Sequence, residues 1–529
     1  MSNLPHDHVH RLIHSMTRAE KRYFKLYITR HASSGEGNHG ILFDAIARME
    51  SYDEAALRQQ YAGKGFMRRF SITKRRLYEA LLNSLDAFHA ESSVDAKLQR
   101  SLHHVEILDQ RALHADAAKV LRSVRTIARH HDRQLVLLQV AEWERRLMER
   151  SNYAQVSHSD LLDRKAQVAG VIREWEEVDQ LWQVKSQSFR MLFRNGQAIT
   201  GPEKAVLAEL RSHGLLADDV LLLTARARFL HHHVRSALAY ASNDLSGCER
   251  ELALNMELLR DEQDRFKDDP DLLLGVMGNL AHVRMRLGKH REAVEGFQAF
   301  RRIPLLMATA PSADLEMKLF ILGSSLKLSL HTASGEFDKA MEVVGEVEKG
   351  FEHFGEPTSL IRRSDLFTQI AYACFGAERY DLSLRWCNRV LNEKGIEEHT
   401  EMHALARILD LMTLMELGKT DLLPYTLRNM QRSLRTQDSP HGLLTIMLKF
   451  CRERVQQSEQ ARPQFQELVD QLEAMSEQTS GVAALDQVDL LSWALAKSQG
   501  RSFGAVVRER GANRAIKPTR GSDGPLKAA

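Results

Sequence analysis

The chain has 529 residues, of which 43% are hydrophobic and 27% charged, and a formal net charge of +3. This length exceeds what one compact core usually organises, so we expect several domains or an array that grows by adding layers. The small net charge excludes a nucleic-acid-attracting field over the whole molecule, and only 11 prolines and 29 glycines argue against long disordered tracts.

The fold class follows from the distribution of helix breakers. No proline lies between Pro5 and Pro202, and runs of strand type are scarce everywhere, so we predict an all-α protein. The start has no apolar core of signal-peptide length, and no window approaches a membrane span, so we expect a cytoplasmic protein without a membrane partner. The four cysteines stand singly, and we expect Cys374 and Cys387 to be small buried hydrophobes.

Residues 1–95 are predicted to form a separate basic helical module. Residues 1–90 carry 14 Lys and Arg against 9 Asp and Glu. Thr17 and Glu20 have the spacing of a capping box that opens a helix. Three further helices are expected: one over about 41–49, a short one that ends at Tyr61, and one over 70–88. A glycine-containing break precedes the last of them.

Basic side chains gather at the start of the 70–88 helix. They are Lys64, Arg68, Arg69, Lys74, Arg75 and Arg76. A short helix, a glycine turn and a basic second helix are the outline of a helix-turn-helix, in which such side chains meet phosphates and base edges. The other interpretation is a packing or partner-binding cap whose cations solvate a helix face. These six residues are therefore candidates for nucleic-acid binding.

Residues 96–212 are predicted to contain long helices that continue or cap a solenoid. Residues 161–193 look like one helix with an apolar residue near every seventh position. That seam consists of Trp175, Val178, Trp182, Phe189 and Leu192. We expect it to pack against neighbouring helices, which is the commoner fate of such a stripe; the other interpretation is the seam of a coiled-coil dimer.

Residues 213–498 contain a repeated spacing. Ala281 is followed by Gly288, Ala293, Phe297 and Phe300 at offsets of 7, 12, 16 and 19. The same offsets link Ala371, Glu378, Ser383, Cys387 and Val390. Small residues let two helices approach closely and a turn glycine relaxes the connection between them, so the pattern predicts stacked helical hairpins.

This internal spacing resembles the tetratricopeptide repeat (TPR). The resemblance implies an α-solenoid of helical hairpins, although the small residues that open successive second helices lie 40 to 47 residues apart, more than the roughly 34 of a strict array. The stretch Met16-Thr17-Arg18-Ala19-Glu20-Lys21-Arg22-Tyr23-Phe24 also resembles the opening of a group of uncharacterised bacterial TPR-type proteins. That second resemblance supports the domain division and implies no activity.

The last segment, residues 499–529, bears glycine, arginine, lysine and proline and little apolar content, and it is expected to be a disordered basic tail. Nucleotide, acyl-transfer and zinc-protease motifs are absent from the sequence. We therefore expect no enzyme activity, no cofactor and no metal.

The sequence supports two candidate functions. The first is a non-enzymatic scaffold that binds a peptide or partner protein on the concave face of the superhelix, where Asn279, Arg284 and Arg286 are candidate contacts. The second is a transcriptional or other nucleic-acid-binding regulator, with the basic module as reader and the repeats as sensor or dimerisation region.

Overall fold

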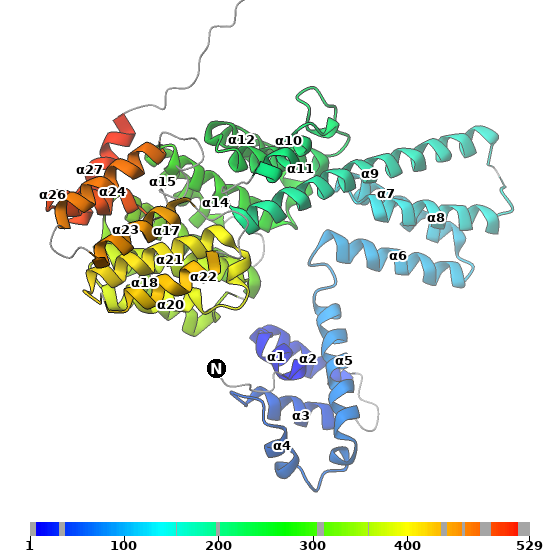
Figure 1. The fold of residues 1–529 in the computed structure, drawn as a ribbon. Coiled ribbons are helices and arrows are strands. Elements are labelled where there is room, and N and C mark those ends of the chain that lie inside the picture. Colours follow the sequence, from blue (N-terminus) through cyan, green and yellow to red (C-terminus); the bar gives the residue numbers. More distant parts are fainter. Residues whose placement is uncertain are drawn as a thin grey trace, which may run out of the picture. The chain divides into compact units, whose positions relative to one another are not determined.

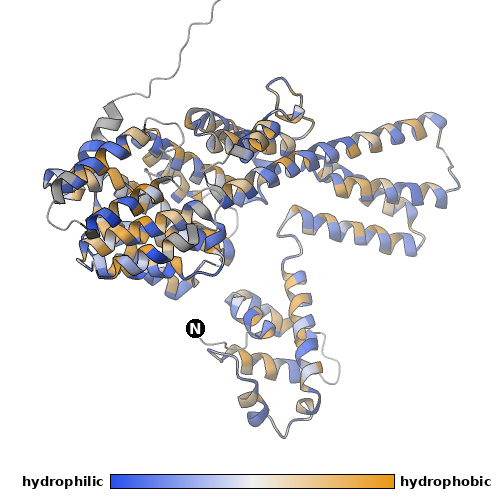
Figure 2. Cartoon of the chain, in the orientation of Figure 1, coloured by the Kyte–Doolittle hydropathy of each residue, from blue (hydrophilic) through white to orange (hydrophobic). Residues whose placement is uncertain are grey.

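The computed structural model describes residues 7–30, 37–154, 156–196, 201–303, 312–357, 359–419, 421–434, 442–456, 461–476 and 488–516. All regular structure in these ranges is helical, which confirms the all-α class. The chain divides into two units, Met1–Val171 and Ile172–Ala529, and the boundary falls inside one helix. The helices of both units contain interspersed apolar and polar residues (Figure 2).

The first unit begins with the residues that the sequence assigns to a basic module. Its helices are α1 (His8–Ser15), α2 (Arg18–Arg30), α3 (Gly37–Ala47), α4 (Glu54–Gln60), the 3-10 helix η1 (Gly65–Arg69) and α5 (Phe70–Phe88). The capping box is present, because the Thr17 amide donates to Glu20 at 2.6 Å and the Glu20 amide donates to the Thr17 hydroxyl at 3.2 Å. Val9, Phe24 and Leu77 belong to the buried core of this module.

Three further helices form a second packed group in the first unit. They are α6 (Val94–Gln110), α7 (His114–His130) and α8 (Gln134–Arg150), followed by the long α9 (His158–Asn195), which continues into the second unit (Figure 1). The helix predicted over 161–193 is thereby confirmed. Ala117 of α7 is fully buried in the core to which α6, α7 and α8 contribute.

The second unit consists of consecutive helix pairs. After α10 (Gly201–Arg211) and η2 (Gly214–Leu216), these pairs are α11 (Ala225–Ala241) with α12 (Leu245–Asp261), α14 (Pro270–Arg286) with α15 (His290–Arg301), α17 (Ala313–Ala333) with α18 (Phe337–Phe354), α19 (Leu360–Gly376) with α20 (Tyr380–Leu391), α21 (Thr400–Glu416) with α22 (Leu423–Leu434), α23 (Gly442–Gln456) with α24 (Ala461–Ser476), and α26 (Leu490–Gln499) with α27 (Phe503–Ile516). Two short elements intervene, α13 (Gln263–Phe266) and η3 (Ile396–Glu398). Within the described ranges, the two members contact one another in every pair except α21 and α22, where α22 packs on α23 instead, and most pairs also contact the next, which is consistent with a repeat array.

One turn recurs in these hairpins. A residue with positive φ follows the first helix, and the next amide donates to a carbonyl five residues earlier, which satisfies an otherwise unpaired helix end. Gly288 has a φ of +74° and Lys289 donates to Arg284 at 2.9 Å; Glu378 has a φ of +60° and Arg379 donates to Cys374 at 2.8 Å. The two positions aligned by the repeat spacing therefore adopt the same conformation, although only one is glycine.

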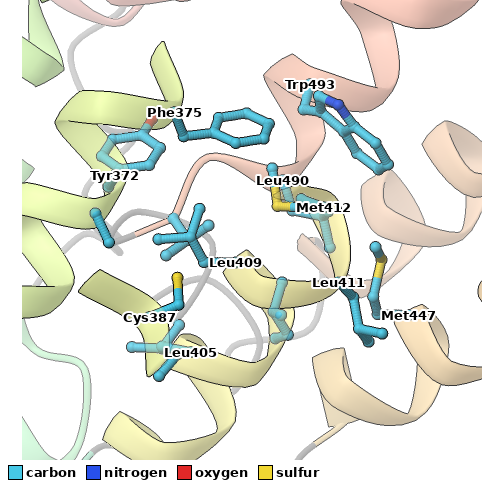
Figure 3. Packing of buried hydrophobic residues seen from close by; sticks show 14 of the residues in the cluster. Tyr372, Phe375, Cys387, Leu405, Leu409, Leu411, Met412, Met447, Leu490 and Trp493 are labelled. Carbon is cyan, nitrogen blue, oxygen red and sulfur yellow. The ribbon is translucent and has the colours of Figure 1, made fainter. Parts of the chain in front are cut away.

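The largest core surrounds the first helices of the later pairs. Tyr372 and Phe375 of α19, Leu409 of α21, Met447 of α23 and Trp493 of α26 converge there (Figure 3). Almost every residue of α19 from Leu366 to Phe375 is buried, as is nearly all of α21 from residue 403 to 414. Neighbours enclose these two segments on nearly all sides, and most of their residues are apolar, although α21 also buries His403 and Asp410.

The carboxyl-terminal segment differs from expectation. Residues 503–516, within the predicted disordered tail, form α27, and residues 517–529 lie outside the described residues. Phe503 stacks on Phe337 with 5.4 Å between ring centroids, and the Arg508 guanidinium donates to the Gly335 carbonyl at 2.9 Å. The segment is ordered because these contacts are made with a hairpin far away in the sequence.

Candidate functional site

Five of the six candidate nucleic-acid-binding side chains are exposed. Lys64, Arg68 and Arg69 lie at η1, where Phe66 anchors the backbone in the core, and Arg75 and Arg76 lie on the first turns of α5. Ile72 is 48% exposed among them. The arrangement brings a group of cations to one connection and the following helix start, and such a group can contact phosphates.

Lys74 does not belong to this exposed group, contrary to expectation. Its side chain is 15% exposed, and its ammonium lies 2.8 Å from Asp7 and 3.3 Å from Glu54. It also donates to the Tyr52 hydroxyl at 3.1 Å. Burial disfavours the ammonium, but these hydrogen bonds and charges outweigh it and raise the pKa of Lys74. Lys74 thus fastens α1 and α4 to α5.

The three partner-binding candidates on α14 occupy different environments. Asn279 is exposed. The Arg284 guanidinium donates to Glu249 at 3.2 Å, and that of Arg286 donates to the Asn243 side chain at 3.4 Å. Both arginines therefore connect α14 to the preceding hairpin, and of the three only Asn279 presents an exposed side chain.

The long helix α9 has two apolar faces in the second unit. On one face Leu181 and Val184 are 0% and 5% exposed, and they belong to the core that α9 forms with α11. On the other face Trp175 and Trp182 are 39% and 56% exposed. The expected packing of the predicted seam is thus wrong for these two tryptophans, while Val178 and Leu192 are partly buried against the core.

Two more apolar residues extend the exposed face. Ile172 is 41% exposed and Phe193 is 50% exposed. At 3.6 residues per turn, residues 172, 175, 182 and 193 fall on one side of the helix. We call this set, Ile172, Trp175, Trp182 and Phe193, the α9 stripe. An exposed apolar stripe with two tryptophans is a candidate interaction surface.

The charges along α9 are segregated. Residues 173–179 hold four carboxylates and one arginine, whereas residues 185–194 hold three cations and no carboxylate. Burial raises the pKa of Glu177, which accepts the Leu223 amide at 3.0 Å. Burial, assisted by the nearby Arg226, lowers the pKa of Lys185, whose ammonium lies 5.8 Å from the Phe189 ring centre.

A cavity of about 250 Å³ lies between α7, α8 and the first half of α9. Its wall includes Arg125, Glu144 and Arg164. The Glu144 carboxylate forms ion pairs with both arginines, and it lies 2.8 Å from the Arg164 guanidinium. Burial and the repulsion of Arg164 and Arg129 lower the pKa of Arg125. The sequence did not suggest this site, because its charges come from three helices; it fastens α9 to α7 and α8.

Comparison with models of known protein families, and with curated proteins, finds no match to this chain. Among the described residues, no helix is both long and apolar enough to cross a membrane. The same part of the chain contains no group of three or more His, Cys, Asp or Glu side chains placed to hold a metal ion.

Proposed function

We propose that this chain is a non-enzymatic protein-interaction scaffold built on a TPR-like superhelix. The hairpin repeat supports the superhelix, because the residues aligned by spacing take equivalent structural positions: Ala281 and Ala371 are buried, as are Ala293 and Ser383. A stacked array of this kind serves as a rigid support for binding surfaces. Its partner is a protein or peptide rather than a small substrate.

The α9 stripe is the observation that carries the proposal. The first helices α19 and α21, which would line a concave face, are enclosed by the chain itself and offer little surface. In contrast, Trp175 and Trp182 present large amphipathic side chains to the outside. Tryptophan is enriched among residues that contribute most to protein–protein binding. The main docking surface in the proposal therefore lies on α9.

A paired substitution tests the proposal. Trp175→Gln together with Trp182→Gln removes the apolar contact while both positions stay on an exposed helix face. Leu254→Gln with Val294→Gln is the matched control, because these side chains are 38% and 39% exposed on other helices of the same unit. Tagged chains are recovered from nuclease-treated lysate and their partners quantified. The proposal expects losses only with the tryptophan pair, and equal recovery by all chains would overturn it.

The exposed cations of η1 and α5 support a second candidate function, a nucleic-acid-binding regulator. Neutralising Lys64, Arg68, Arg69, Arg75 and Arg76 to glutamine would weaken binding to a labelled duplex and flatten its salt dependence, because fewer counterions are released. Neutralising Arg111, directly after α6, together with Lys119 and Arg122 on α7 is the control, because these three side chains are also exposed. Absence of salt-dependent binding by the unaltered chain would eliminate this candidate.

A further inference from the structure

The α9 stripe has the length and pattern of a helix-pairing surface. Trp175 and Trp182 are one heptad apart, and Phe189, half-buried, follows after another. Ile172 and Phe193 stand near the two ends of the same face. A seven-residue repeat on a straight helix is the pattern by which one helix packs along another. The surface therefore fits a partner helix of about six turns.

The charges beside the stripe identify which helix fits. In a parallel pair of identical α9 helices, the carboxylates that flank the stripe, Glu176 and Asp179, would lie level with those of the other copy and repel them. In an antiparallel pair centred on Trp182, positions 174–179 of one helix lie opposite positions 190–185 of the other. The acidic segment of each helix then meets the basic segment of its partner, at both ends of the pair.

We propose that a second copy of this chain covers the α9 stripe, in an antiparallel two-fold α9–α9 pair with Trp182 at the axis. This inference rests on the proposed scaffold function and names one partner for its docking surface. The two-fold arrangement places Trp175 of each copy opposite Phe189 of the other. The interface is isologous, so each favourable contact occurs twice.

Charged residues on one flank of the stripe agree with this arrangement. At about 100° per residue, Glu176 and Arg190 lie on the same side of Trp182, and both are exposed. In an antiparallel two-fold pair, residues on the same flank of the two helices face each other. Arg190 of one copy is then level with position 174 of the other, within one turn of Glu176, and the two side chains can form an ion pair that the two-fold axis repeats.

The apolar area sets the expected strength of the dimer. The four stripe residues are 39% to 56% exposed. At roughly 200 Å² for a large side chain, they leave about 400 Å² of apolar surface on each copy. A standard stable interface buries about 800 Å² on each partner. We therefore expect a dissociation constant on the order of micromolar, with dimer forming as the concentration rises from about 1 to 100 μM.

Charge reversal on the full chain tests the inference. One variant carries Glu176→Lys and Asp179→Lys, and a second carries Lys185→Glu and Arg190→Glu; sedimentation velocity measures the mass of each across the concentration range. The unaltered chain should dimerise, each variant should stay monomeric because its α9 helices repel, and the equimolar mixture should dimerise again. A variant that misfolds would fail to recover in the mixture, and circular dichroism of each variant alone identifies it.

Introduced cysteines test the orientation. Asp179 and Ser186 lie near the same height across an antiparallel pair centred on Trp182. Oxidised cross-links should therefore join an Asp179→Cys chain to a Ser186→Cys chain, and neither chain to a second copy of itself. Self-cross-linking of each variant would indicate a parallel pair and overturn the inference. The four natural cysteines are buried and free, so they do not compete.

The two proposals fail in different ways. An unaltered chain that stays monomeric at 100 μM overturns the α9–α9 pair, yet tryptophan-dependent recovery of another protein would leave the scaffold function standing. A chain that dimerises as expected but recovers the same proteins with and without Trp175 and Trp182 would support the pair and overturn the scaffold surface.

Discussion

Replacing Glu378 with glycine is expected to stabilise the protein. Glu378 has a φ of +60° in the turn between α19 and α20, where a residue with a β-carbon is strained by roughly 1 to 2 kcal/mol. Glycine removes that strain but adds about 0.5 to 1 kcal/mol of backbone entropy to the unfolded chain. Since the Glu378 side chain is exposed, its loss costs little. The net expectation is a gain of about 0.5 to 1 kcal/mol.

Urea unfolding followed by circular dichroism measures this gain, and the midpoint should rise without a change in slope. Glu342→Gly is the matched control, because Glu342 is exposed inside α18, where glycine should instead cost about 1 kcal/mol. If both substitutions destabilised the protein equally, Glu378 would not occupy a left-handed turn, and the equivalence of this turn with the Gly288 turn would be refuted.

Three further predictions concern contacts that join distant segments. Gly335→Ala should release α27, because a β-carbon there would lie 2.9 Å from the Gly504 carbonyl at a φ of +65°, and amide exchange over residues 503–511 should quicken while that of α21 stays slow. Lys74→Met should destabilise the first unit by about 2 kcal/mol, because Asp7 loses its buried partner, whereas Arg75→Met, at a side chain 76% exposed, should change its melting temperature little. Burial raises the pKa of Asp365 to about 6, above its unfolded value, so the carboxylate opposes folding at higher pH; Asp365→Asn should stabilise the protein by up to about 3 kcal/mol at pH 8, and this advantage should vanish by pH 4 in parallel urea titrations.

The hairpins were predictable because their determinants are local. The small residues Ala281 and Ala293 and the turn glycine between them lie within 13 residues, and they suffice to predict a hairpin. The helix predicted over 70–88 is likewise found at those bounds. The equivalence of Glu378 with Gly288 was visible only as a spacing, since glutamate is not a residue that favours positive φ.

The errors concern contacts made over long sequence separations. From the sequence, Lys74 resembles the other exposed cations of a basic helix. Its partner Asp7 lies 67 residues earlier, so the ion pair is not visible in the local pattern. The α27 segment was predicted to be a disordered tail because its apolar content is low. It is helical because it packs on the α17–α18 turn, which lies far away in the sequence. On α9, the pattern identified an apolar seam but did not show which of two faces the core would cover, and the tryptophans lie on the uncovered one.

Amide hydrogen exchange of the chain alone and in its recovered assembly tests the scaffold account most directly. Slower exchange over residues 172–194 in the assembly, with residues 64–76 unchanged, is the result that the account predicts. Unchanged exchange over α9 with new protection at residues 64–76 would contradict it and assign the interaction to the basic module.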